Sequence, residues 1–210
     1  MNTLRLSALS VIALLASLFT LPAQAAPIEG QDYTVLSNPE TILGDKIGVR
    51  EFFWYGCGHC YNLEPYAQAY DRTKPKDVAF YQTPAALNPV WEANARGFYS
   101  VQYLNKLDSV HQKTFDAIHK GNQRLFDQKS LSDFYGSQGI DTKKFNQLYN
   151  SFAVSTKVGK SKAAAQRYQL TGVPAVVVQG KYVVKGEGPQ VFQTVNYLVD
   201  KVRTEMKPRH

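Results

Sequence analysis

The feature that most constrains this chain is a pair of cysteines three positions apart, in the segment GCGHCY at residues 56–61. Cys57 and Cys60 are the only cysteines in the sequence. In the chain-entropy treatment, closing so short a loop stabilises a fold by only about 2 kcal/mol, and the strain of a small ring lowers that value. The spacing therefore indicates a disulfide that forms and breaks readily rather than one that holds a fold together.

The neighbouring residues predict that the cysteines lie where a strand ends and a helix begins. Residues 49–55 are mostly apolar and aromatic, as in a central strand, and apolar side chains recur at helical spacing over 60–73. Unpaired backbone N–H groups and the helix dipole stabilise a thiolate at such a helix start. We therefore expect a low pKa for Cys57, to which His59 contributes a hydrogen bond or a positive charge.

A low pKa decides the chemistry of the pair. It makes Cys57 a good leaving group and stabilises the reduced state, so that the oxidised pair is a stronger oxidant. Cys60, one helical turn further along the chain, is expected to be buried, less reactive and able to resolve a mixed disulfide. Gly58 lets the small ring close without a side-chain clash, but it does not hold the loop as a proline would.

Metal binding is a weaker interpretation of the same cysteines. A structural zinc site needs four ligands, and the pair supplies two. His111 and His119 are the histidines best able to add ligands, but their separation of eight residues is not a usual ligand spacing. We therefore expect no metal and no cofactor. A chaperone that binds copper or zinc through the dithiol stays open as the alternative from another functional class.

The rest of the chain has the pattern of an α/β fold. Strands are predicted at residues 32–36, 49–55, 78–82, 175–178 and 181–184. The strand–helix–strand unit over 49–82 implies parallel strands. The last two strands form a hairpin through Gln179 and Gly180, and Gly188 and Pro189 introduce a final amphipathic helix.

A run of helices interrupts this pattern. Residues 84–169 have apolar side chains at helical spacing and predict several helices in succession. Within this run, Ser130 is interpreted as the N-cap residue of a capping box. Asp141 is interpreted as the cap of a further helix, with Phe145 and Phe152 on its apolar face.

The first 25 residues have the three parts of a secretory signal peptide: a positive residue, Arg5, an apolar run, and the sequence Ala23-Gln24-Ala25. The apolar run is short for a membrane span. We expect residues 1–25 to be removed and the remaining chain to be exported and soluble. Its net charge falls from +7 to +6, because one arginine and no acid are lost. That charge is scattered, so we expect no nucleic-acid partner.

Two stretches resemble the thioredoxin superfamily and, within it, the DsbA-type oxidases that introduce disulfides into exported bacterial proteins. They are residues 51–64, which contain both cysteines, and residues 172–182, which contain Val173 and Pro174. The resemblance covers essentially the whole chain after the signal peptide. It implies an α/β, thioredoxin-like fold with an inserted all-helical domain. The implied division is 26–83 with 170–210 for the thioredoxin-like domain and 84–169 for the helical insertion domain.

The resemblance also implies roles for residues around the cysteines. Val173–Pro174 matches the family's cis-proline, which leaves the backbone of Val173 free to pair with an extended substrate. Glu51 and Glu64 match acids that tune the buried cysteine and relay its proton. From the residues alone, other interpretations stay open: a trans proline, an ion pair of Glu51 with a cation such as Lys46, and a surface position for Glu64.

The function implied is that of a periplasmic, monomeric thiol:disulfide oxidoreductase. Its substrates would be unfolded or reduced exported proteins, and a DsbB-type, quinone-linked membrane protein would reoxidise it. One departure keeps an alternative open. Gly58 stands where the family more often has proline, and Cys-Gly-His-Cys resembles the tetrad of eukaryotic protein disulfide isomerase. A milder oxidase, or an isomerase or reductase with the same fold, is therefore the second hypothesis.

Overall fold

A mixed five-stranded sheet forms the centre of the molecule, with its strands in the order β1-β5-β4-β2-β3. The structure, a computed structural model, describes residues 25–40 and 44–206, so the predicted signal peptide lies outside it except for Ala25. The strands are β1 (Tyr33–Val35), β2 (Ile47–Phe53), β3 (Val78–Pro84), β4 (Ala175–Val178) and β5 (Tyr182–Lys185). β2 and β3 are parallel, as predicted, and the other neighbouring strands are antiparallel.

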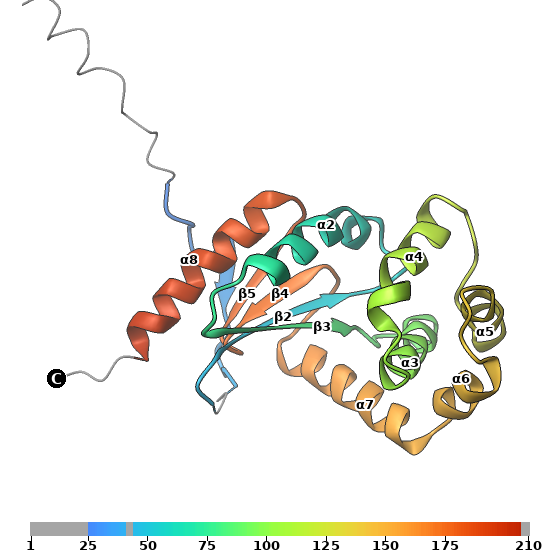
Figure 1. The fold of residues 1–210 in the computed structure, drawn as a ribbon. Coiled ribbons are helices and arrows are strands. Elements are labelled where there is room, and N and C mark those ends of the chain that lie inside the picture. The colour runs from blue at the N-terminus through green and yellow to red at the C-terminus, as the bar shows by residue number, and fades with distance from the viewer. Residues whose placement is uncertain (1–24, 41–43, 207–210) are drawn as a thin grey trace, which may run out of the picture.

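Two helices cover one face of this sheet, α2 (Gly58–Thr73) and α8 (Pro189–Glu205), as Figure 1 shows. Their apolar sides pack against β2 and β4 in a core that contains Val49, Leu63 and Leu198. Each of these side chains is fully buried or nearly so, which is where most of the favourable free energy of folding arises. The core holds α2, and with it both cysteines, at the end of β2.

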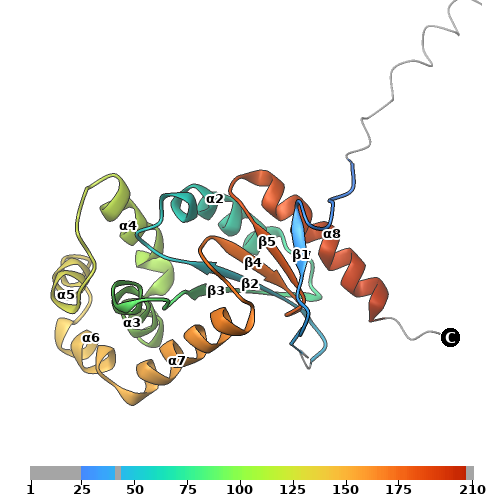
Figure 2. The same cartoon turned by 180° about the vertical axis from the view of Figure 1, so that it is seen from behind.

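The helices inserted between β3 and β4 form a separate layer beside the sheet (Figures 1 and 2). They are α3 (Pro89–Tyr103), α4 (Leu107–His119), α5 (Gln128–Ser137), α6 (Thr142–Tyr149) and α7 (Phe152–Arg167). This layer has a core of its own, which includes Leu131 and Tyr135. A further cluster joins it to the end of β2 through Phe53, Phe98 and Phe115. Within residues 25–40 and 44–206, no helix has the length and apolar character needed to cross a membrane.

Two local predictions in the inserted segment are wrong. The N-cap of α5 is Asp127 rather than Ser130, because the Asp127 carboxylate accepts the Ser130 N–H at 2.8 Å and the Ser130 hydroxyl accepts the Asp127 N–H. The capping box is therefore present, but it starts three residues earlier. Phe152 does not lie on α6, because that helix ends at Tyr149 and Ser151 caps α7. Phe152 is the first residue of α7, and its side chain is 87% exposed.

Candidate active site

The two cysteines lie at the junction that the sequence predicts. β2 ends at Phe53, and a turn closed by the Cys57 N–H and the Trp54 carbonyl at 3.0 Å leads into α2. Cys57 is the N-cap residue, with an extended backbone, and its sulfur accepts the Cys60 N–H at 3.4 Å. Both cysteines are free thiols; Cys57 is half-buried and Cys60 is fully buried. Cys57 is therefore the sulfur that an incoming thiol is able to reach.

The surroundings separate the pKa values of the two thiols. The pKa of Cys57 is lowered to about 6, chiefly by the hydrogen bond from the Cys60 thiol and then by the backbone N–H groups of Cys60 and His59, while burial opposes the shift. Burial raises the pKa of the Cys60 thiol, and its hydrogen bond to Cys57 raises it further. At neutral pH the reduced pair is thus one thiolate and one thiol.

The side chain of His59 does not donate a hydrogen bond to Cys57, which was one of the two contributions expected from it. Its ring is exposed and its Nδ1 lies 3.0 Å from the carboxylate of Glu187, in the loop before α8. That pairing raises the pKa of His59. The hydrogen bond to Cys57 comes from the backbone N–H of His59, and the ring contributes only its charge. Sequence analysis did not single out Glu187, because nothing local connects it with the motif.

The loop before β4 brings Val173 and Pro174 to the cysteines. The bond between these two residues is cis, as the resemblance led us to expect. The Cys57 sulfur lies 3.4 Å from the carbonyl oxygen of Val173, to which it donates a hydrogen bond when it is protonated. Val173 is only half-buried, so its backbone lies beside the reactive sulfur at the surface of the molecule.

Glu51 and Glu64 share one hydrogen-bond partner, and both are fully buried. The side-chain amide of Gln82 donates to both carboxylates, at 3.0 Å to Glu51 and 2.8 Å to Glu64. Burial, followed by the charge of Glu64, raises the pKa of Glu51 to about 8. Two interpretations left open by the sequence are wrong: Glu51 has the amide of Gln82 as its partner instead of Lys46, and Glu64 is not on the surface.

Two histidines of α4 connect the inserted helices to the segment before the cysteines. His111 Nδ1 lies 2.7 Å from the Tyr55 hydroxyl, and His119 Nε2 lies 2.8 Å from the Tyr55 carbonyl oxygen. His111 Nε2 also lies 3.3 Å from a carboxylate oxygen of Glu64, but without the direction of a hydrogen bond. These histidines were considered as possible metal ligands, but the structure gives them partners around Tyr55. No sequence signal reveals this pairing.

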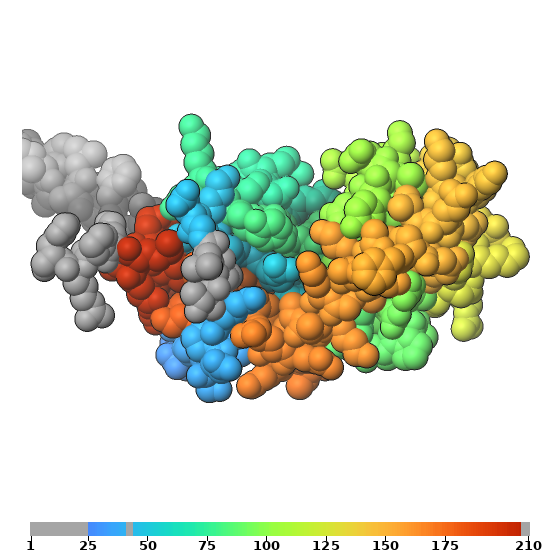
Figure 3. Space-filling model, turned by 90° about the horizontal axis from the view of Figure 1, so that it is seen from below, coloured from blue at the N-terminus to red at the C-terminus, as the bar shows by residue number. Residues whose placement is uncertain are grey.

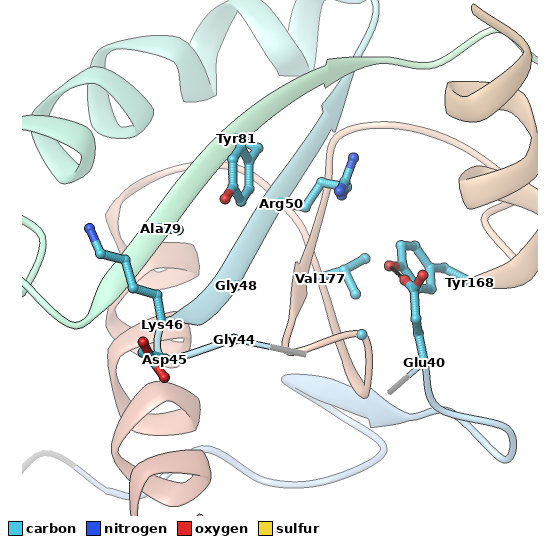
Figure 4. A pocket seen from close by; sticks show the side chains of 11 residues that line it. Glu40, Gly44, Asp45, Lys46, Gly48, Arg50, Ala79, Tyr81, Tyr168 and Val177 are labelled. Atoms are coloured by element: carbon cyan, nitrogen blue, oxygen red, sulfur yellow. Dashed lines mark hydrogen bonds between the residues drawn. The ribbon is translucent and has the colours of Figure 1, made fainter. Parts of the chain in front are cut away.

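Two of the cavities in the described part of the chain bear on the location of the site. A cavity of about 440 Å³ between α2 and α4 is lined by Glu64, Gln82 and His111. A cavity of about 580 Å³ lies on the sheet face opposite α2 and α8, with Tyr81 and Tyr168 on opposite sides of it (Figure 4). Neither cysteine lines this larger cavity, so it is not the site of the thiol chemistry.

Comparisons with known proteins agree with this geometry. Residues 91–198 match the family described as a DSBA-like thioredoxin domain. The thiol:disulfide interchange protein DsbA of Pseudomonas aeruginosa is 37% identical over 205 residues, which cover 95% of this chain and 97% of the relative. DsbA of Pseudomonas syringae is 38% identical over 207 residues, covering 95% of this chain and 96% of the relative.

Solved structures give the same result. The crystal structure of Pseudomonas aeruginosa DsbA has a TM-score of 0.82 and 36% identity, covering 87% of this chain and 97% of that one. Reduced DsbA1 of Neisseria meningitidis has a TM-score of 0.76 and 30% identity, covering 87% of this chain and 98% of that one. The predicted α/β fold with inserted helices is thereby confirmed. With its reactive pair at Cys57 and Cys60, the chain belongs to the DsbA family of thiol:disulfide interchange proteins.

Proposed function

We propose that this thiol:disulfide interchange protein works as an oxidase, which donates the Cys57–Cys60 disulfide to reduced proteins in the periplasm. The observation that carries the proposal is the lowered pKa of Cys57, about 6, beside a Cys60 whose pKa is raised. A thiolate stabilised in the reduced protein favours reduction of the pair, so that the disulfide form gives up its bond readily. The relatives are named for disulfide interchange, which fits this chemistry.

The proposed reaction has two steps. A substrate thiolate attacks the sulfur of Cys57, the Cys57–Cys60 bond breaks, and Cys60 leaves with the electron pair and takes up a proton. A second substrate thiolate then attacks the substrate sulfur of the mixed disulfide and releases Cys57 as a thiolate. The substrate loses two electrons and two protons overall. One proton ends on Cys60 and the other in solvent, because Cys57 stays ionised at neutral pH.

The surrounding residues support these steps in the roles we propose for them. The backbone of Val173, beside cis-Pro174, holds the substrate in an extended conformation next to Cys57, as in strand addition. Glu51 is protonated at neutral pH, because its pKa is about 8. It supplies the proton that Cys60 needs on leaving and regains one, through solvent, from the two protons that the substrate releases. Glu64 controls the proton affinity of Glu51 through its charge.

Membership of the family supports a proposal for the partners and the compartment. Substrates are reduced or unfolded exported proteins, and we propose that residues 1–25 direct this chain to the periplasm. Reoxidation requires an acceptor for two electrons, and we propose a DsbB-type, quinone-linked membrane protein. Its loop would occupy the same surface over Cys57 and beside Pro174, and one monomer suffices for the reaction.

The decisive experiment is the equilibrium of the dithiol with glutathione. Reference potentials are about −120 mV for DsbA, the family's own established value, and about −180 mV for protein disulfide isomerase. We expect a result between these two. A potential near −270 mV, that of thioredoxin, would make the protein a reductase and overturn the proposal.

A pair of variants tests the division of labour between the cysteines. Cys57→Ser is expected to abolish oxidation of a dithiol peptide, because it removes the sulfur that is attacked. Cys60→Ser is expected to trap mixed disulfides with periplasmic proteins, because the resolving thiol is gone. Only monomeric protein on a non-reducing gel of Cys60→Ser would contradict this assignment.

Gly58 favours isomerase activity as the second candidate function. It gives the chain the Cys-Gly-His-Cys tetrad that resembles protein disulfide isomerase, and the space next to its Cα is open. Reactivation of a scrambled substrate without added oxidant would support that function. If the protein oxidises a reduced substrate but does not reactivate a scrambled one, the isomerase hypothesis is excluded and the oxidase proposal is supported.

A further inference from the structure

The second half of the helical insertion carries an unbalanced positive charge. Between Asp141 and Glu187 the sequence contains eight lysines and arginines but no aspartate or glutamate. Four of these cations are on α7: Lys157, Lys160, Lys162 and Arg167. Charge of one sign that is concentrated on one helix attracts surfaces of the opposite sign, and the attraction is weakened by salt.

Several other helices carry acids that pair with part of their positive charge. On α3, α5 and α8, and at the end of α4, a cation pairs with an acid three or four residues away. The pairs are Arg96–Glu92, Lys120–Asp116, Lys129–Asp133 and Arg203–Asp200. Across residues 25–40 and 44–206, none of the four α7 cations takes part in an ion pair. Their charge is therefore available to a partner outside the chain.

The exposed face of α7 has a shape suited to a flat partner. Its buried side holds Val154 and Val158, and the middle of its exposed side, by helical spacing, holds three small uncharged residues: Thr156, Gly159 and Ala163. The cations flank this strip. Phe152, 87% exposed, extends an apolar ring from the start of the helix. A strip of small residues between long cations, with an aromatic ring at its end, can approach a plane closely.

The position of α7 leaves this face free. Figure 3 shows α7, in orange, on the surface of the face seen from below. In Figures 1 and 2, α2 and α7 lie on opposite sides of the molecule, so the start of α2 is not on the exposed face of α7. A partner bound along α7 therefore does not cover Cys57.

We propose that α7 is a peripheral docking surface for a bilayer that contains anionic phospholipids. The four cations bind lipid phosphates, the strip of small residues lies against the headgroups, and Phe152 enters the boundary between headgroups and acyl chains. Attachment through a few cations and one ring is reversible, so the protein is able to leave the surface and turn its cysteines toward a membrane-embedded partner. The docking surface is independent of the direction of the redox reaction.

Vesicle binding tests the docking surface. Protein recovered from the periplasm is used, so that residues 1–25, which we expect to be removed on export, do not bind lipid themselves. It is sedimented with vesicles of phosphatidylcholine alone or mixed with phosphatidylglycerol. We expect binding only to the mixed vesicles and release by added salt. Equal binding to both vesicle types, or to neither, would overturn the proposal.

Two variants and a matched control separate this surface from net charge. The triple variant K157Q/K160Q/K162Q is expected to bind roughly 100-fold more weakly, from about a fivefold contribution of each lysine near an anionic surface. The control K76Q/K106Q/K113Q loses the same charge at exposed positions outside α7 and is expected to bind normally. If both triple variants lose vesicle binding equally, net charge rather than the α7 surface accounts for binding, and the proposal is overturned.

Phe152→Ser keeps every charge and removes the apolar ring. It is expected to weaken vesicle binding severalfold, while oxidation of a soluble dithiol peptide is unchanged in all of these variants. Unchanged binding would overturn the role of Phe152 as an anchor. The peptide assay and far-ultraviolet circular dichroism establish that each variant is folded before its binding is compared.

Discussion

At the scale of single residues, the chemistry rests on the unequal surroundings of two identical side chains. Cys57, half-buried, accepts hydrogen bonds from the Cys60 thiol and from backbone N–H groups, and its pKa falls to about 6. Cys60 is fully buried, and this burial raises the pKa of its thiol. The same principle of burial without a counter-charge raises the pKa of Glu51.

The thiolate of Cys57 predicts a pH-dependent stability of the reduced protein. Its pKa is lowered from 9.0 to about 6 by folding, so the stabilisation is fully present above pH 9 and is lost as the pH falls through about 6. The oxidised protein has no thiol to titrate and serves as the control. We expect the stability advantage of the reduced over the oxidised form, measured by urea unfolding, to shrink as the pH falls from neutrality through 6. A constant difference would contradict the lowered pKa.

Glu51→Gln tests the buried acid. Folding raises the pKa of Glu51 from 4.5 to about 8, so its favourable contribution is greatest below pH 4.5 and is lost progressively as the pH rises to about 8. Glutamine removes this titration and still offers an oxygen to Gln82. We expect the variant to be more stable than the parent at neutral pH, by on the order of 1–3 kcal/mol.

Urea unfolding at neutral pH and below pH 4.5 separates titration from packing in this variant. The gain in stability is expected to vanish at the acidic pH, where Glu51 is protonated in both the folded and the unfolded chain. A gain of the same size at both pH values would show that the substitution acts through packing and not through the carboxyl proton.

At the scale of elements, the start of α2 combines a reactive site with an ordinary helix terminus. Gly58 is its first helical residue, and an added Cβ there meets no atom within 4 Å. Proline is favoured at this helix position, because its missing N–H would have no partner within the helix. The hydrogen bonds that lower the pKa of Cys57 come from later residues, Cys60 and His59.

Gly58→Pro is therefore expected to stabilise the protein by about 0.4–1 kcal/mol, through a less flexible unfolded chain. The pKa of Cys57, followed by thiolate absorbance, is expected to stay near 6. Gly58→Ala is the matched control, with a smaller stabilisation because alanine restricts the unfolded chain less. A loss of stability in the proline variant would mean that the backbone at this position does not accept proline.

At the scale of the whole molecule, the inserted helices hold the segment that leads to the cysteines. His111 and His119 of α4 contact opposite ends of Tyr55, and His111 reaches Glu64 of α2. The insertion therefore contributes to the geometry of the redox site without supplying either sulfur. The predicted domain division at residues 83–84 and 169–170 stays a prediction, since the cluster around Phe53 is shared by both parts.

His111→Phe tests this connection. The ring volume is kept, but the buried hydroxyl of Tyr55 loses its partner, which is expected to cost about 1–3 kcal/mol in urea unfolding. The double variant Tyr55→Phe/His111→Phe removes both polar groups and is expected to recover most of that loss. A double variant as unstable as the single one would show that ring packing, and not the hydrogen bond, carries the contribution of His111.

Features that depend on neighbouring residues are predictable from the amino-acid sequence alone. The strand–helix junction at Cys57, the cap of α6 at Asp141 and the start of α8 after Gly188 are as predicted, because periodicity and capping act within a few positions. The prediction of Ser130 as an N-cap is wrong by three residues, because Asp127 caps α5 and Ser130 is the other member of the capping box. The cis bond between Val173 and Pro174 was predicted from the family resemblance and not from the neighbouring residues.

Contacts between side chains that are distant in the sequence are set by the packing of the fold. The burial of Glu64, the amide of Gln82 between two acids and the contacts of His111 come from packing between elements far apart in the chain. Burial determines which charges lose water and which partners they keep, and that sets their pKa values. No pattern of neighbours records this, because the distances that matter are set across the core.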